Sequence, residues 1–221
     1  MVPIISARSR APLALASDFG ALDGAALRLV QRRYTERGLA VKGERYSSRH
    51  EDGDVVCTAH DGERVVGTLT VRFDGPGGLN ADLVFGAELA PWRAAGVRLC
   101  EFGSLALDHQ AGDARRLLAQ LFHFAYLHAH RRAQGERRVI EVHPRHVAFY
   151  RRLLGWLPCT TARHNPRVGA PAVLMSFDLA TVRGQIALWG GRPELLARAR
   201  SLYPLAWDRA TEDAMLAQLG G

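Results

Sequence analysis

The sequence predicts an α/β (α+β) protein with a central mixed, twisted sheet, helices on both of its faces and a helical C-terminal extension. Two observations support this prediction. Strand and helix patterns alternate in the second half of the chain, and residues 98–108 are apolar on both faces apart from Glu101 and Ser104. A strand of that kind is covered on both sides, and strands that alternate with helices form partly parallel sheets. The 221 residues, 48% of them hydrophobic, are enough to bury a core.

The expected elements before this central strand are a helix, a hairpin and a helical segment. In chain order they are an irregular lead-in over residues 1–18, a helix over 19–37, strands over 55–59 and 65–71, and one or two short helices over 82–95. Gly38 is placed to end the first helix. Asp61 and Gly62 are a strong hairpin signal because an Asp-Gly pair adopts the positive φ angles of a two-residue turn.

The expected elements after the central strand alternate between helix and strand. They are a long helix over residues 113–134, a buried strand over 139–142, a helix over 147–154, a strand over 172–179, and helices over 181–221 divided at Pro193 and Pro204. We therefore expect one domain over residues 1–180 and a helical extension over residues 181–221, in which no residue suggests chemistry.

The net charge of +7 and the sequence pI of about 10.0 make nucleic acid a first candidate partner. The arginines are scattered, however, and no recognised nucleic-acid motif accompanies them. We expect no nucleic acid, and a small acidic protein fits the charge equally well.

Other classes of protein are also disfavoured. No stretch approaches the roughly 20 apolar residues of a membrane helix, and Arg8 and Arg10 interrupt the N-terminal segment where a secretory signal would be apolar. We therefore expect a cytoplasmic protein with no transmembrane segment. Cys57, Cys100 and Cys159 lie far apart and have no zinc-ligand spacing, so neither a disulfide framework nor a metal site is expected.

Four stretches together resemble the long-chain N-acyl amino acid synthase family, which belongs to the GNAT superfamily and is related to the acyl-homoserine-lactone synthases. In chain order they are ALRLVQRRYTERGL (26–39), VVGTLTV with LVFGAELAPWRAAGVRLCEFGSLALD (65–108), VIEVHPRHVAFYRRLLGW (139–156) and GAPAVLMSFDL (169–179). The resemblance covers about residues 20–180. It implies the GNAT fold for that part of the chain.

The resemblance also implies a function. It indicates an N-acyltransferase that moves a long acyl chain from the thioester of acyl carrier protein to the amino group of an amino acid. The donor would be acyl-phosphopantetheine on the carrier protein, or acyl-CoA, and no tightly bound cofactor is expected. Three alternatives stay open: a CoA-dependent GNAT acetyltransferase, an autoinducer synthase that uses S-adenosylmethionine, and a GNAT-shaped binding protein without turnover.

The loop before the long helix bears on the choice of donor. Ordinary GNAT enzymes have an Arg/Gln-x-x-Gly-x-Gly/Ala loop here, whose backbone N–H groups bind the pyrophosphate of coenzyme A. This chain has HQAGDARR over residues 109–116, in which Asp113 replaces the first glycine expected after Gln110. A carboxylate repels a pyrophosphate. Arg115 and Arg116 are therefore predicted to contact the acidic surface of a carrier protein, or else to be solvated helix-start residues.

Glu101 is the leading candidate for the catalytic base. Aminolysis of a thioester requires an ammonium group to lose a proton, and a carboxyl buried in an apolar strand has a raised pKa that suits this task. The related lactone synthases use a glutamate on the matching strand, and the resemblance implies the same role here. The alternative is a structural glutamate paired with Arg72 or Arg98.

The backbone of the same strand is expected to bind the donor. In the GNAT fold the central strand parts from its neighbour, so that Ser104, Leu105, Ala106 and Leu107 are predicted to bond the pantetheine amides like an added strand. One of their N–H groups would stabilise the oxyanion. Gly103 is the expected bulge residue that opens the gap.

Further candidates follow the next strand. Tyr150 is predicted to protonate the leaving thiolate, as a tyrosine in this neighbourhood does in many GNAT enzymes, or else to pack as a core ring. Arg145 is predicted to hold the carboxylate of the amino acid by a two-point contact, and His146 is a candidate second base. A metal pair of His143 and His146 is disfavoured because no further ligand is evident.

The first helix carries two more candidates. The resemblance implies that Arg33 and Tyr34 help to close the acceptor and acyl pockets. Four aromatic residues are expected either to line an acyl tunnel or to form plain core, namely Phe122, Phe124, Tyr126 and Phe149. The acceptor amino acid and the acyl chain length stay open.

Overall fold

The computed structural model describes residues 13–20, 22, 24–39 and 54–220. Its strands are β1 (Ala14–Phe19), β2 (Val55–Asp61), β3 (Arg64–Phe73), β4 (Leu99–Leu107), β5 (Arg137–Val142), β6 (Leu157–Pro158), β7 (Arg163–Asn165) and β8 (Ala170–Asp178). Its α-helices are α1 (Gly24–Thr35), α3 (Asp82–Ala94), α4 (Ala114–Tyr126), α5 (Val147–Leu154), α6 (Leu179–Trp189), α7 (Leu196–Ala199) and α8 (Arg209–Gly220).

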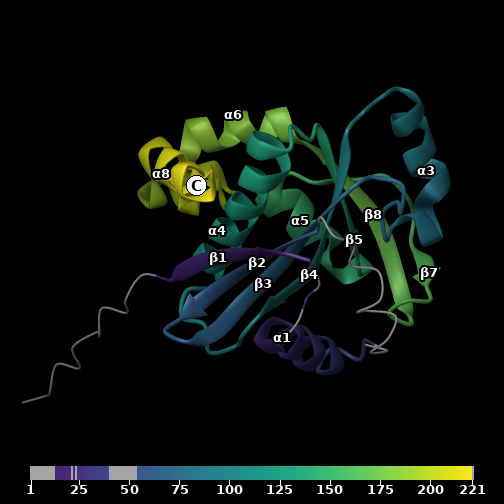
Figure 1. The fold of residues 1–221 in the computed structure, drawn as a ribbon, viewed down its shortest axis with the longest axis horizontal. Helices are drawn as coiled ribbons and strands as arrows, with labels where there is room; N and C mark the ends of the chain where they lie inside the picture. The colour runs from purple at the N-terminus through teal and green to yellow at the C-terminus, as the bar shows by residue number, and fades with distance from the viewer. Residues whose placement is uncertain (1–12, 21, 23, 40–53, 221) are drawn as a thin grey trace, which may run out of the picture.

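The strands form one sheet in the order β1-β2-β3-β4-β5-β8-β6, with β7 paired to β8 (Figure 1). The pair β4–β5 is parallel, and the other pairs are antiparallel. The parallel pair requires a crossover connection, which α4 supplies. The predicted mixed sheet is therefore confirmed.

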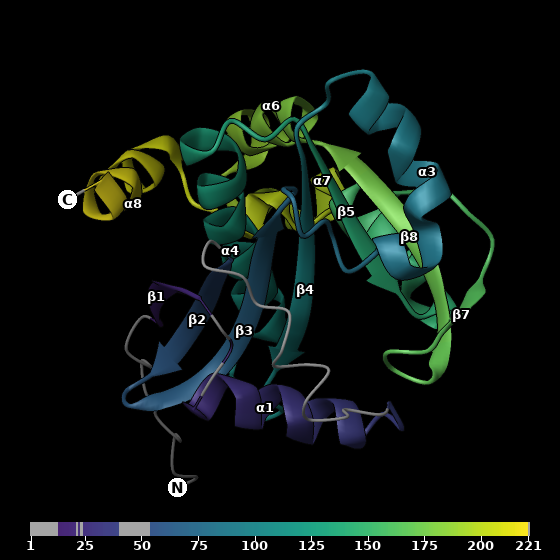
Figure 2. The same cartoon turned by 45° about the vertical axis from the view of Figure 1, so that its right-hand side comes forward.

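Helices cover both faces of this sheet (Figure 2). On one face, α4 contacts β2 and β3 and buries Leu117 and Leu121 in the largest core cluster, to which α5 and the C-terminal segment also contribute. On the other face, α1 buries Leu29 and Val30 against β2 and β4, and α3 buries Phe85 beside β4, β5 and β8. The core thus lies in two layers, as the apolar central strand predicts.

Most of the predicted elements are present, and their ends are set by local chemistry. The hairpin is confirmed, and α5 occupies the predicted residues and ends at Gly155, whose φ of 78° is the left-handed conformation of a helix stop. The segment 82–94 is one helix with a non-helical residue at Phe85. The long helix is α-helical only to Tyr126 and continues as a π-helix over Leu127–Arg132.

The predicted irregular lead-in is wrong for its last residues. Ala14–Phe19 form β1, which pairs antiparallel with β2 over its whole length. Residues 1–12 of the lead-in lie outside the described residues. The strand was missed because β1 is exposed or half-buried along its length, and its Ala, Ser and Asp residues are not among the β-branched and aromatic types that favour strands.

The C-terminal extension is helical, as expected, and it packs against the main core. Tyr203 and Leu205 belong to the same buried cluster as α4, and the Tyr203 hydroxyl donates a hydrogen bond of 3.1 Å to the Leu154 carbonyl. His123 of α4 lies 3.0 Å from the carboxylate of Glu212 in α8. These contacts cover the outer side of α4 and lie away from the opening described below.

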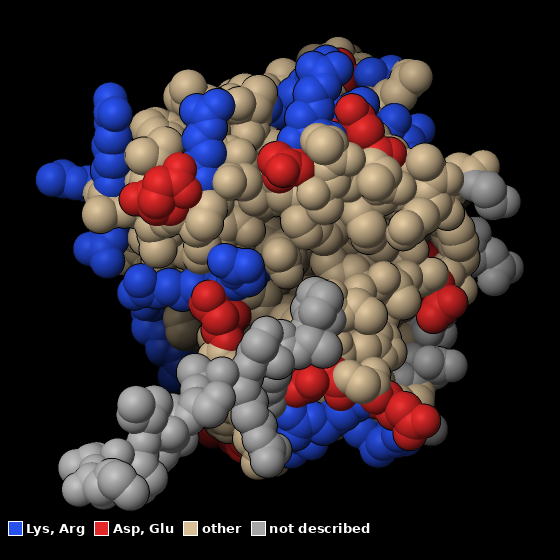
Figure 3. Space-filling model, turned by 90° about the vertical axis from the view of Figure 1, so that its left-hand side faces the viewer, with Lys and Arg blue, Asp and Glu red and all other residues tan. Residues whose placement is uncertain are grey.

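The surface carries mixed charge. On the face shown in Figure 3, blue Lys and Arg side chains form separate groups with red carboxylates between them, and the middle of the face is uncharged. Among the helices of the described residues, none combines the length and the apolar content needed to cross a membrane.

Candidate active site

The sheet opens at the parallel pair in its centre. Strands β4 and β5 pair at only three positions, the last of which joins Glu101 to Val139. Beyond this point β4 continues to Leu107 and stays paired with β3 on its other side. The β4 backbone from Phe102 onward therefore presents polar groups to a gap, and such groups need partners. The predicted parting of the strands is confirmed.

A bulge in β4 accompanies the opening. Gly103 lies opposite Thr70 and Ala106 lies opposite Thr68, so that Ser104 and Leu105 together oppose one residue of β3. Ser104 has a φ of 49°, which is the left-handed region and is uncommon for a residue other than glycine. The bulge was predicted at Gly103, and it lies one residue later.

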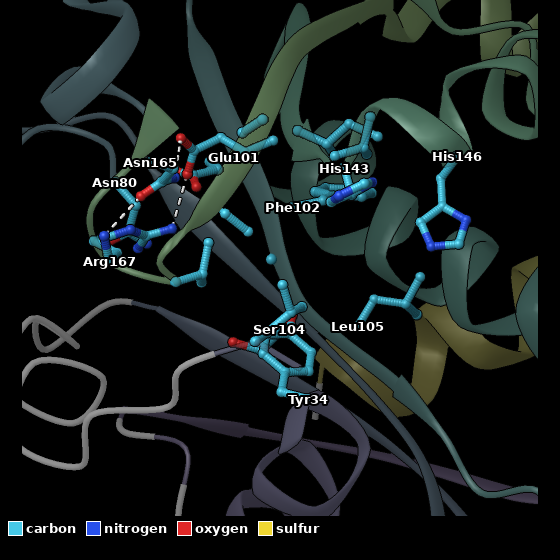
Figure 4. Close-up of a pocket in the computed structure, with 18 of the residues that line it drawn as sticks. Tyr34, Asn80, Glu101, Phe102, Ser104, Leu105, His143, His146, Asn165 and Arg167 are labelled. Carbon is cyan, nitrogen blue, oxygen red and sulfur yellow. Dashed lines mark hydrogen bonds and ion pairs between the residues drawn. The ribbon is translucent and has the colours of Figure 1, made fainter. Parts of the chain in front are cut away.

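A cavity of about 160 Å³ occupies the opening. Its wall is formed by β4 residues 101–105, by β5 and the residues that follow it, by the end of α1 and by the turn between β7 and β8. In Figure 4, Glu101 lies at one side of this cavity with Asn165 and Arg167, and His146 lies at the other, with Phe102 between them. The cavity therefore brings together residues that are far apart in the sequence.

Glu101 is buried, with 3% of its surface exposed, and it lines the cavity. Its Oε2 atom accepts a hydrogen bond of 3.1 Å from the backbone N–H of Ala81. This bond is the only one that the described residues make to the carboxylate, so that Oε1 is available to a ligand in the cavity. A buried carboxylate with one hydrogen bond is poorly stabilised in its charged form.

Neither arginine named in the structural alternative, Arg72 or Arg98, pairs with Glu101. Arg72 forms an ion pair with Asp54, with Nη2 2.8 Å from the carboxylate, and Arg98 pairs with Glu136 at 3.7 Å. No arginine among the described residues lies within 4 Å of the Glu101 carboxylate. The glutamate is therefore buried without a direct cationic partner in the part of the chain that the structure describes.

The environment of Glu101 raises its pKa to about 7. Burial is the largest cause, and the nearby charge of Glu141 adds to it, whereas the charges of Arg167 and Arg72 lower the pKa. A carboxylate with a pKa near 7 is a stronger base than an ordinary glutamate. At pH 7 about half of the molecules carry it in the ionised form that can accept a proton. The electrostatics of the site thus suit the predicted base.

A second carboxylate near the base was missed by the sequence analysis. Glu141 of β5 accepts hydrogen bonds of 2.8 Å from the side chains of Asn165 and Arg167, and burial raises its pKa. The signal was available, because Glu141 interrupts an apolar strand just as Glu101 does. Asn165 and Arg167 stand in a short turn with no distinguishing pattern.

Tyr150 lines the cavity from α5. Its ring packs edge-on against Phe122 and Trp156, with centroids 6.3 and 6.5 Å away. Burial raises the pKa of Tyr150 to about 12, so that the hydroxyl is protonated at neutral pH but is a weaker acid than a tyrosine in water. The residue is therefore both a packed ring and a cavity residue, and the two predicted roles are compatible.

Arg145 and His146 also line the cavity. The Arg145 Nε atom lies 3.2 Å from His146 Nε2, and burial together with the Arg145 charge lowers the pKa of His146. A neutral imidazole can accept a proton. No group of three metal-ligating side chains exists in the described part of the chain, so His143 and His146 have no further ligand there.

The structure brings only some of the predicted donor and acceptor residues to the cavity. Ser104, Leu105 and Tyr34 line it. Ala106 packs beneath α1, and Leu107 lies farther along β4 against the largest core cluster. These two residues are not in the cavity wall, although their backbone lies along the same open strand edge.

Arg33 does not reach the cavity. It lies on the buried side of α1 and contacts Glu36 and His109. Its neighbour Tyr34 faces the cavity because adjacent residues of a helix point about 100° apart. A direct role for Arg33 in closing the pocket is therefore not supported by its position.

Of the aromatic residues predicted for an acyl tunnel, Phe122 alone lines the cavity. Phe124 packs against Trp207 of the C-terminal segment, with ring centroids 6.2 Å apart, and Tyr126 is buried beside His123 on the same outer side of α4. Phe149 is exposed. The plain-core interpretation thus holds for Phe124 and Tyr126.

The N-terminus of α4 is occupied by its own cap. Asp113 Oδ1 accepts hydrogen bonds from the backbone N–H groups of Arg115 and Arg116, at 3.1 and 3.0 Å. These are the groups that a pyrophosphate would use in a glycine-rich loop. The side chains of Arg115 and Arg116 are exposed to solvent.

The sequence matches the model of a known protein family. The model named for the N-acyl amino acid synthase FeeM matches residues 25–178, which contain the whole cavity wall. This chain belongs to that family. The FeeM-family chain is therefore an N-acyltransferase, as the sequence motifs predicted. No protein with curated annotation matches the sequence.

Solved structures agree with the family. The structure of FeeM, an N-acyl amino acid synthase from uncultured soil microbes, matches this family member with a TM-score of 0.67 and 26% identity, covering 78% of this chain and 94% of that one. The AHL synthase LasI matches at 0.53 and 14% identity, covering 76% and 91%. Arabidopsis thaliana NAA60 in complex with acetyl-CoA matches at 0.51 and 12% identity, covering 76% and 99%. The last two show the fold alone, and the predicted GNAT fold is confirmed.

Proposed function

We propose that this acyltransferase moves a long acyl chain from the thioester of acyl carrier protein to the amino group of an amino acid, with Glu101 as the base. The observation that supports this most directly is the position of Glu101. It is a buried carboxylate that no arginine of the described ranges contacts, and it faces a cavity at the point where β4 and β5 part. The family of N-acyl amino acid synthases supports the same reaction.

The proposed reaction begins with the acceptor amine. The Glu101 carboxylate takes one proton from the ammonium group, directly or through a water molecule, and the neutral amine then attacks the thioester carbon. The C–N bond forms as the C–S bond breaks, and backbone N–H groups of residues 104–107 stabilise the oxyanion. The attacking nitrogen then gives its second proton to the neutral imidazole of His146 or to water, and the departing thiolate takes a proton from Tyr150, so that an amide and a thiol are formed.

The donor would lie along the open edge of β4. Its pantetheine amides would bond to the β4 backbone as an added strand does. A carrier-protein donor is supported by Asp113, because its carboxylate already caps the N–H groups that a coenzyme A pyrophosphate would need. A phosphopantetheine arm has a single phosphate and does not need them. The exposed Arg115 and Arg116 would attract the acidic carrier.

The acceptor would lie at the side of the cavity where Arg145 is found. Arg145 is exposed at the cavity wall and is proposed to hold the α-carboxylate of the amino acid. The amine would then point along the cavity toward Glu101. Phe122 and Tyr34 are the aromatic wall residues that would border the acyl chain or the acceptor side chain.

The proposal is tested by incubating the purified protein with acyl carrier protein loaded with a long acyl chain and a mixture of amino acids, and by detecting N-acyl amino acids by mass spectrometry. Parallel reactions contain long acyl-CoA, acetyl-CoA, or S-adenosylmethionine with acyl carrier protein. We expect product with the carrier-protein donor and its loss in Glu101→Gln. Transfer from acyl-CoA alone would contradict the donor, and undiminished transfer by Glu101→Gln would contradict the base.

A further inference from the structure

The second carboxylate of the site, Glu141, is held in one orientation. Its Oε1 atom accepts a hydrogen bond from Asn165 Nδ2 and its Oε2 atom accepts one from Arg167 Nη2, both at 2.8 Å. Asn165 is itself fixed, since it is 1% exposed and its Oδ1 accepts the backbone N–H of Arg167 at 2.9 Å. The turn between β7 and β8 thus delivers an amide and a guanidinium to the same glutamate.

Glu101 and Glu141 lie within reach of one arginine but do not share it. Both line the cavity, and Arg167, which bonds to Glu141, lies on the same side of the cavity as Glu101 (Figure 4). The guanidinium of Arg167 bonds to Glu141, whereas the Glu101 carboxylate has only the N–H of Ala81 from the described residues. An arginine in direct contact lowers the pKa of a carboxyl group by roughly 1–3 units, and such a shift would weaken Glu101 as a base.

We propose that Glu141 is a positioning residue for the acyl transfer: it holds the Arg167 guanidinium and so keeps this arginine from pairing with Glu101. The inference rests on the proposed function, in which Glu101 is the base. Glu141 touches neither the donor nor the acceptor in this scheme. It acts on the reaction through the charge that surrounds Glu101.

In the described part of the chain, the other elements packed against Glu101 do not supply a charge that pairs with Arg167. Arg72, on the neighbouring strand β3, is paired with Asp54. The segment before α3 contributes the Ala81 N–H and no charge. The charges of Glu141 and Arg167 act on Glu101 more strongly than that of Arg72 does, and a single substitution in this pair leaves either a net positive or a net negative charge beside Glu101.

Two substitutions unbalance the pair in opposite directions. Glu141→Gln keeps the shape but removes the negative charge, so that this charge no longer offsets that of Arg167 and the pKa of Glu101 falls. Arg167→Gln removes the positive charge and leaves the negative one, so that this pKa rises. Glu141→Gln combined with Arg167→Gln removes both charges, and burial alone then returns the pKa toward the wild-type value.

The measurement is the pH profile of kcat/KM for acyl transfer, with acyl carrier protein as donor. We expect its acidic limb to move down by about one unit or more in Glu141→Gln, so that the rate at pH 6 rises from about a tenth to about half or more of the plateau. We expect the limb to move up in Arg167→Gln and to return in the double variant. The plateau rate of Glu141→Gln should fall, because a less basic carboxylate is a weaker base.

The matched control is Glu88→Gln. Glu88 of α3 pairs with Arg163 of β7, so this variant removes a glutamate–arginine pair that anchors the same β7–β8 hairpin without changing the charge beside Glu101. It should leave the limb in place. A limb that stays fixed in both Glu141→Gln and Arg167→Gln, or that moves equally in Glu88→Gln, overturns the inference and leaves Glu141 a structural role.

A second readout separates this inference from the proposed function. The Glu101 carboxyl can be titrated by NMR in protein labelled with ¹³C-glutamate, and its signal is identified by its absence in Glu101→Gln. The same downward and upward shifts should appear without any substrate. If the wild-type protein transfers no acyl group but these shifts occur, the proposed function fails and the charge balance holds. If the titration does not shift, the inference fails.

Discussion

Replacing Glu101 with glutamine is expected to stabilise the folded protein at alkaline pH. The pKa of Glu101 is raised from 4.5 to about 7 by burial and by the nearby Glu141 charge. The folded state therefore binds this proton more tightly than the unfolded state does. The stability that Glu101 contributes is complete below about pH 4.5 and is lost as the pH rises through about 7.

The magnitude follows from the size of the shift. One pKa unit corresponds to about 1.4 kcal/mol, so a shift from 4.5 to about 7 corresponds to about 3 kcal/mol of lost stability above about pH 8. Glutamine is neutral at every pH and does not incur this loss. Its amide oxygen can still accept the Ala81 N–H.

The assay is equilibrium unfolding in urea at pH 5 and pH 8. Glu101→Gln should exceed the wild type in free energy of unfolding by about 3 kcal/mol at pH 8 and by much less at pH 5. Glu63→Gln, at an exposed position in the β2–β3 turn, is the control and should show no such dependence. A variant less stable than the wild type at pH 8, or a gain that does not change with pH, would refute the reasoning.

Three further substitutions test the structure. Asp113→Ala removes the cap of α4 and should cost about 1 kcal/mol in urea unfolding, whereas Asp113→Asn, an equally good cap, should cost little. Glu212→Gln keeps an oxygen that can accept a hydrogen bond but removes the negative charge that faces His123 and Arg131, and it should cost about 2 kcal/mol near neutral pH. Because folding lowers the pKa of Glu212, this cost should shrink as the pH falls through that pKa, and a constant cost would contradict the charge argument. Gly155→Ala places a side chain at a φ of 78° and within 3.0 Å of Phe177, and should lower the melting temperature through a cost of about 1–2 kcal/mol; an unchanged melting temperature would contradict it.

Local patterns predicted much of the fold. The hairpin at Asp61–Gly62, the central strand around Glu101 and the helix before Gly155 each carry their own turn, alternation or stop signal, and each is present. Such signals act over a few residues. β1 carries none, because its residues are mostly exposed and its pairing with β2 is made across a long separation in the sequence.

The candidate site also contains residues that the sequence could identify and residues that it could not. Glu101 could be found because a carboxylate in a strand that is apolar on both faces is unusual whatever surrounds it. Arg33 and Tyr34 are adjacent on one helix, yet only Tyr34 faces the cavity. Which of two neighbours points inward depends on the packing angle of that helix, and no local pattern gives this angle.

The sequence by itself determined the family, the order of most elements and the identity of the buried carboxylate, because these depend on local composition and spacing. The tertiary structure decided where β4 and β5 part, which residue forms the bulge, and that Arg167 bonds to Glu141 while Glu101 faces the cavity with one hydrogen bond. Those features depend on groups from β3, β5 and the β7–β8 turn that meet only when the sheet has formed. The charge around the base is therefore a property of the assembled fold.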